Sequence, residues 1–119
     1  MNLANLFRNE PNPVEGVDGQ RIIDEGGKSD RMYVVLEGTV DIVVAGQTVE
    51  SVGEGGVFGE MSLIDDQAAS ASAVVRGGAK LASIDERRFL FLVQQHPTFA
   101  LNLMRVMSGR LRKMDRQRA

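Results

Sequence analysis

The residues best suited to chemistry lie in the glycine-rich segment 53–75, around Phe58, Gly59 and Glu60. The run 61–64 (Met-Ser-Leu-Ile) is compatible with one helical turn, and the free N–H groups that open such a turn can bind an anion. Gly59 lets the backbone approach a ligand closely. The carboxylate of Glu60 cannot bind that anion, but it can accept hydrogen bonds from the hydroxyls of an attached sugar. The segment therefore suits a small phosphorylated sugar, and a helix-capping carboxylate is the alternative role for Glu60.

The elements that precede this segment and lead into it have the pattern of strands. Four short β-branched runs, each followed by glycine, occupy residues 21–23, 32–36, 39–44 and 47–52. Within the third run Val40, Ile42 and Val44 occupy every second position, as in a strand with one buried face. Regularly spaced strands with glycine turns predict a β-barrel or β-sandwich.

Helical patterns stand at both ends of the chain. Residues 2–8 are amphipathic, and two prolines follow at 11 and 13. Near the other end, Asp85 is placed as an N-cap and Pro97 divides two helices. The second helix carries an apolar series at spacings of four, three, four and three, which is a heptad seam. This seam consists of Ala100, Met104, Met107, Leu111 and Met114.

Composition limits the classes of function. A chain of 119 residues suits one domain, and it contains no cysteine, so thiolate metal sites and disulfides are excluded. We expect a cytoplasmic protein, since no signal peptide and no apolar run of about 20 residues is present. The last ten residues hold five basic residues and one acid, a charge of +4, so the net −2 leaves −6 for residues 1–109. An acidic body disfavours nucleic acid.

Several ordered motifs resemble those of the cyclic-nucleotide-binding domains. These domains occur in bacterial catabolite-activator-type regulators, in regulatory subunits of cyclic-AMP-dependent kinase and in gated channels. The resemblance spans residues 14–112, and Phe58-Gly59-Glu60-Met61-Ser62-Leu63 matches the opening of the family's phosphate-binding cassette. The other matching positions are 24–27, 30–35, 37–40, Phe89, Pro97 and 109–111.

The resemblance implies a mainly β fold with helical ends. The expected fold is an antiparallel double-stranded β-helix (a jelly-roll or β-roll, cupin-like) with a short N-terminal helix and two C-terminal helices. The single domain 1–119 would comprise a lead-in over 1–13, the roll over 14–84 with its cassette at 58–75, and helices over 85–119.

The resemblance also implies site roles. Glu60 would bind the ribose 2′-hydroxyl of cyclic AMP or cyclic GMP. Backbone N–H groups around Gly59, Met61, Ser62 and Ser70 would face the cyclic phosphate. The C-terminal helix would move as a lid, and no cofactor is expected.

One position departs from the family pattern. The family's cassette continues to a proline and a phosphate-binding arginine, and here Ala68 and Ala69 occupy those positions. An insertion of one residue would put the arginine at Ser70. Either the cassette binds nucleotide weakly or with altered specificity, with Arg76 or a neighbouring chain supplying the charge, or it binds none.

Two further hypotheses concern the C-terminal helix. The seam at Met104, Met107, Leu111 and Met114 either packs on the roll or forms a homodimer interface. The basic cluster at 110–118 is expected to be a solvated helix end. A non-binding interaction module is therefore the alternative function, and a truncated transcription regulator is a weaker one, since no DNA-binding domain follows in this chain.

An enzyme or a metal site is not expected. His96 is the only histidine, and it stands at a helix junction where capping explains it. A metal site of the cupin type needs several histidines, and a catalytic triad would depend on this one residue. We therefore predict a regulatory binding module.

Overall fold

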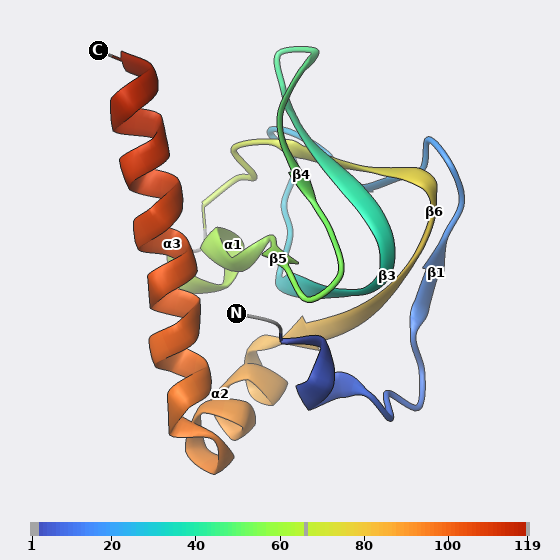
Figure 1. The fold of residues 1–119 in the computed structure, drawn as a ribbon, viewed down its shortest axis with the longest axis vertical. Coiled ribbons are helices and arrows are strands. Elements are labelled where there is room, and N and C mark those ends of the chain that lie inside the picture. The colour runs from blue at the N-terminus through green and yellow to red at the C-terminus, as the bar shows by residue number, and fades with distance from the viewer. Residues whose placement is uncertain (1–2, 66, 119) are drawn as a thin grey trace. The chain divides into compact units, whose positions relative to one another are not determined.

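The computed structural model describes residues 3–65 and 67–118, without the side chains of Met114, Gln117 and Arg118. The chain divides into two compact units, one ending at Glu86 and one beginning at Arg87 (Figure 1). The first unit holds the strands and the second holds most of the helical residues. The elements of the first unit are the 3₁₀-helix η1 (Ala4–Phe7), β1 (Val14–Gly16), β2 (Arg21–Ile23), β3 (Arg31–Val44), β4 (Gln47–Val52), β5 (Val57–Phe58), α1 (Glu60–Asp65) and β6 (Ser72–Asp85).

The described strands pair in an antiparallel sheet built on its two longest members. The order is β1-β6-β3-β4, while β2 also pairs with β6 and β5 also pairs with β3. Because β3 and β6 are long and curve together, each meets different partners at its two ends (Figure 1). The predicted antiparallel β-roll with helical ends is therefore confirmed. The lead-in, predicted as a helix over residues 2–8, is the single 3₁₀ turn η1.

The structure has one strand where the sequence predicts two, and Gly38 lies where the two were expected to separate. The runs 32–36 and 39–44 were predicted as separate strands, but β3 continues through both. Gly38 has a φ of +90°, and the register with β6 shifts on both sides of it. A Cβ atom at this position would collide with the carbonyl oxygen of Gly78 and lie 2.9 Å from the Cα atom of Ala79. Glycine here bends the paired strands without ending them.

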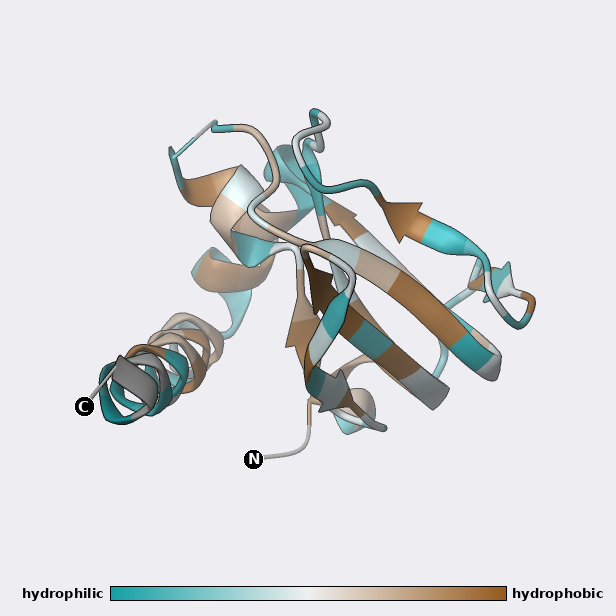
Figure 2. Cartoon of the chain, turned by 90° about the horizontal axis from the view of Figure 1, so that it is seen from above, coloured by the Kyte–Doolittle hydropathy of each residue, from teal (hydrophilic) through white to brown (hydrophobic). Residues whose placement is uncertain are grey.

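One face of the sheet carries the main hydrophobic core, which we call the core cluster. Its members are Ile23, Val35, Val40, Val52, Phe58, Ala73, Val75, Ala79 and Leu81. Tyr33 packs at its edge and stacks on Phe58 with ring centroids 5.2 Å apart. Hydrophobic and hydrophilic bands alternate along the strands, as expected when successive side chains take opposite faces (Figure 2).

The second unit contains two helices, α2 (Glu86–Gln95), whose first residue ends the first unit, and α3 (Pro97–Arg118). His96 alone separates them, and its backbone caps both, since its N–H donates to the carbonyl of Leu92 at 2.7 Å and its carbonyl accepts from Phe99 at 2.8 Å. Phe89 and Phe99 meet edge to face, with centroids 5.8 Å apart. The predicted break at Pro97 is confirmed.

Candidate functional site

The predicted cassette begins with a left-handed glycine between β5 and α1. Gly59 has a φ of +79°, and its carbonyl accepts a hydrogen bond from the Ser62 N–H at 3.3 Å. A Cβ atom at this position would lie 2.9 Å from both the Arg31 carbonyl oxygen and Ile23 Cδ1. Contacts within the chain therefore require glycine at this position even when no ligand is bound.

The three residues after Gly59 have different environments. Glu60 and Ser62 are buried, with 4% and 8% of their surfaces exposed, whereas Met61 is 47% exposed. A buried carboxylate is stable only with a polar or charged partner, and Glu60 has such a partner in the fold. Glu60 is therefore held within the protein and is not a solvated surface acid.

The far end of the cassette returns to the same core cluster. Ala69 donates its N–H to the Gly27 carbonyl at 2.8 Å, and its own carbonyl accepts from the Gly26 N–H at 2.8 Å. Its methyl group packs against the core cluster, while Ser70 is exposed. Because Gly59 lies against Ile23 of that cluster, the two ends of the cassette border one apolar surface.

Arg76 does not supply the charge that Ala69 lacks. Its guanidinium Nε lies 2.9 Å from Asp41 Oδ2, and Asp41 Oδ1 also accepts from the Ser51 hydroxyl at 2.7 Å. Hydrogen bonds from Ser51 and from Arg76 hold the pKa of Asp41 below its usual range. Since the neighbouring Val75 belongs to the core cluster, Arg76 lies on the opposite face of β6.

This ion pair is a feature that sequence analysis missed. It joins β3 to β6, and the Ser51 hydroxyl adds β4; the sequence does not reveal the order and register of these strands. The only available signal was the alternation of polar and apolar residues in each run.

The predicted seam on α3 is divided between exposed and half-buried positions. Met104 and Leu111 are 57% and 60% exposed, and Met107 is half-buried. The side chain of Met114 lies outside those that the structure describes. The residues of α3 that are buried are Phe99 and Leu103. Part of the predicted seam is thus an apolar surface open to a partner.

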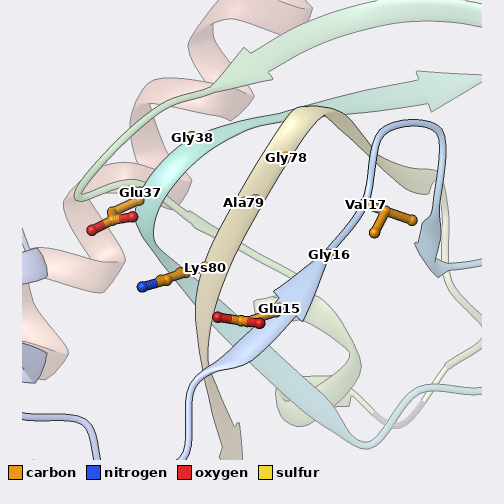
Figure 3. Close-up of a pocket in the computed structure, with 8 residues that line it drawn as sticks. All are labelled: Glu15, Gly16, Val17, Glu37, Gly38, Gly78, Ala79 and Lys80. Atoms are coloured by element: carbon orange, nitrogen blue, oxygen red, sulfur yellow. The ribbon is translucent and has the colours of Figure 1, made fainter.

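A separate shallow hollow of about 360 Å³ lies where β1 pairs with β6 (Figure 3). The register places Lys80 opposite Glu15 on one side and Glu37 on the other. None of the predicted site residues lines this hollow. Among the residues that the structure describes, no group of three or more His, Cys, Asp or Glu side chains could hold a metal ion.

Comparison with known proteins assigns the fold and the cassette to one family. The model of the cyclic nucleotide-binding domain matches residues 14–96, well over half of the chain. The chain belongs to the cyclic nucleotide-binding domain family. The resemblance seen in the cassette motif is thereby confirmed, and the curved sheet with its antiparallel strands is the β-roll of that family.

Individual members of the family show the same relationship. The cyclic AMP receptor protein of Thermus thermophilus is 34% identical over 102 residues, which cover 82% of this chain and 47% of that protein. The crystal structure of the Thermus thermophilus catabolite activator protein matches with a TM-score of 0.78 and 32% identity, over 87% of this chain and 51% of that chain.

A cAMP-bound form of the EAL enzyme Bd1971 matches with a TM-score of 0.65 and 33% identity, over 86% of this chain and 29% of that chain. The chain thus spans about half the length of the curated relative it matches. Within the described residues no helix is long and apolar enough to cross a membrane.

Proposed function

We propose that this cyclic nucleotide-binding domain is a sensory module that binds cyclic AMP or a related nucleotide weakly or with altered specificity. Its family membership and the buried Glu60 directly after Gly59 support a ligand site in the cassette. Ala69 in place of the family's arginine supports the weakened or altered binding, because its methyl group packs on the core cluster and offers no charge.

The expected loss follows from the missing hydrogen bond. A charge-assisted hydrogen bond contributes about 1.5–3 kcal/mol, and about 1.4 kcal/mol corresponds to a tenfold change in affinity. The absence of the arginine should therefore weaken cyclic nucleotide binding by about ten- to 150-fold. Ser70 can donate a hydrogen bond, but its hydroxyl carries no charge.

Isothermal titration with cyclic AMP and cyclic GMP tests this function. We expect micromolar or weaker binding that Glu60→Ala reduces and that Glu54→Ala, a change at an exposed turn residue, leaves unchanged. Circular dichroism of both variants controls for folding. Absence of heat with either nucleotide at millimolar concentration, in the wild type and in Ala69→Arg, would refute the proposal.

Coupling of ligand to output is assigned to α3. By resemblance to its family, this helix would move as a lid, which requires different ligand affinities in two positions of the helix. The family is one of binding domains, and we assign the module no catalytic role. A cytoplasmic location is expected, since the chain contains no cysteine.

A second candidate function is homodimerisation through α3, which the exposure of Met104 and Leu111 favours. In a parallel two-stranded coil, the residue at position g of one helix meets the residue at position e, five places later, of the other. On the predicted seam these two positions are occupied by Arg110 and Asp115. In a parallel dimer Arg110, which also has a partner within its own chain, would approach Asp115 of the second copy.

Light scattering after size-exclusion chromatography tests the dimer. Arg110→Asp should shift the equilibrium toward monomer, and adding Asp115→Arg should restore the dimer because the pair is reversed. Arg112→Asp is the matched control, since residue 112 lies outside the seam and the flanking e and g positions. If the wild type is still monomeric at a protein concentration of about 100 μM, the dimer interface is refuted.

A further inference from the structure

The loop 24–30, which joins β2 to β3, meets the start of the cassette at both of its own ends. The loop follows Ile23, and it leads into Arg31. A Cβ atom added at Gly59 would lie 2.9 Å from Ile23 Cδ1 and 2.9 Å from the Arg31 carbonyl oxygen. Both ends of the loop are therefore held against the glycine that opens the cassette.

The middle of the same loop pairs with the far end of the cassette. Gly26 donates its N–H to the Ala69 carbonyl, and the Gly27 carbonyl accepts from the Ala69 N–H, each at 2.8 Å. This contact continues the antiparallel pairing of β2 with β6. Because the two segments run in opposite directions, Lys28, the residue after Gly27, lies on the side of Ala69 that leads back toward α1. The loop thus places Lys28 beside the cassette.

Lys28 is the only basic residue of this loop, and its side chain is exposed. The three acids of the loop have partners other than Lys28. These partners are Arg21, 3.7 Å from Asp24; Arg31, 3.8 Å from Asp30; and the Ala45 N–H, which donates to Glu25 at 3.0 Å. Within the loop, the ammonium group of Lys28 is therefore available to a ligand.

The arginines of the two long strands are directed elsewhere. Arg76 is paired with Asp41 on the opposite face of the sheet. Arg31 donates to the Ser83 hydroxyl at 3.1 Å, and Ser83 belongs to β6. The cassette follows β5, and β5 and β6 pair with opposite edges of β3. The guanidinium group of Arg31 is therefore bonded on the side of β3 away from β5 and Gly59.

We propose that Lys28 binds the phosphate of the cyclic nucleotide in place of the arginine that the cassette lacks. This inference rests on the proposed function, since it takes the cassette as the ligand site. Lys28 adjoins the pair that Gly27 forms with Ala69, and Ala69 occupies the position of the family's arginine. A lysine side chain has a flexible four-carbon stem and three donors. An ammonium group binds phosphate as a point charge, without the two parallel hydrogen bonds of a guanidinium group, so this cation restores only part of the affinity.

Isothermal titration of Lys28→Gln with cyclic AMP tests the inference. We expect this variant to bind about tenfold or more weakly than the wild type, because one charge-assisted hydrogen bond is lost. Lys28→Arg should retain binding, since it keeps the charge. Lys80→Gln is the matched control: it changes the net charge equally, but Lys80 lines the separate hollow beside β1 and should leave the affinity unchanged.

Two further measurements distinguish a contact with phosphate from a structural role. Added salt should weaken cyclic AMP binding more in the wild type than in Lys28→Gln, because the variant has one ionic contact fewer. In the background of Ala69→Arg, Lys28→Gln should weaken binding less than it does alone, since the arginine then supplies a charge to the same phosphate. A purely structural effect of Lys28 would be the same in both backgrounds.

The outcomes separate this inference from the function on which it rests. If the wild type and Lys28→Gln bind cyclic AMP equally well, the inference is overturned and the proposed function stands. The same conclusion follows if Lys80→Gln weakens binding as much, because the effect then comes from net charge. If Ala69→Arg binds cyclic AMP and the wild type does not, the cassette is a nucleotide site and Lys28 is not its cation. If neither protein binds, both proposals fail.

Discussion

Replacing Gly59 by alanine should destabilise the protein even when no ligand is present. The residue has a φ of +79°, and left-handed backbone costs an alanine about 1–2 kcal/mol. The added Cβ would also lie 2.9 Å from the Arg31 carbonyl oxygen and from Ile23 Cδ1, so the backbone or the core must shift. Overpacking of this kind costs about 1–3 kcal/mol. The two effects together predict a loss of about 2–5 kcal/mol of unfolding free energy, since both act on the folded state.

Gly26 provides the matched control for this substitution. Its φ is +81°, but a Cβ atom there would meet nothing within 4 Å. Gly26→Ala should therefore show the backbone cost alone, and urea unfolding followed by circular dichroism should separate the two variants by about 1–3 kcal/mol. Equal losses in the two variants would refute the conclusion that Gly59 is required by its contact with β3 and the core cluster.

Three further changes test separate parts of the roll. Hydrogen bonds from Ser51 and Arg76 lower the pKa of Asp41 in the folded protein. The ionised carboxylate therefore stabilises the fold above the usual Asp pKa of about 4, and this stabilisation is lost as the pH falls through the lower pKa of the folded state. Arg76→Ala should therefore cost about 1 kcal/mol at pH 7 and less in acid, and an equal cost at pH 3 in urea unfolding would contradict this. Ala45 has a φ of +51° in the turn between β3 and β4, so Ala45→Asn should raise the melting temperature, and a lower one would argue against the turn geometry. Tyr33 is the only tyrosine, and burial raises its pKa. Its ultraviolet titration should therefore have a midpoint above pH 10, and the stability of the protein should fall as pH rises past 10. A midpoint at or below pH 10 would show that the ring is not buried.

Several features of the site followed from residue types and local order. The run 61–64 was predicted as one helical turn directly after the glycine and acid at 59 and 60, and the structure has α1 there, because a first-turn acid favours such a turn locally. The absence of an arginine at Ala69 is a property of the chain that no fold can change. The break at Pro97 was equally local, since proline lacks an N–H group and favours the first turn of a helix. These predictions depend on neighbours within a few positions.

The features that the sequence did not reveal depend on pairing between distant residues. Arg76 appeared available to the cassette until the strand register placed it beside Asp41, 35 positions earlier in the chain. The face that Glu50 takes is likewise decided only by the register of β4 against β3, and that register shifts beyond Ile42.

The sequence by itself determined the family, the succession of strands and helices, Glu60 as the candidate acid of the cassette and the absence of an arginine at position 69. The tertiary structure alone decided where the remaining charges lie. A shift of one residue in strand register moves every side chain to the opposite face, so long-range pairing sets the face that each charged residue takes. The same reason explains Gly38. A local pattern marks it as a turn, but its pairing with Ala79 of β6 makes it a bend within β3.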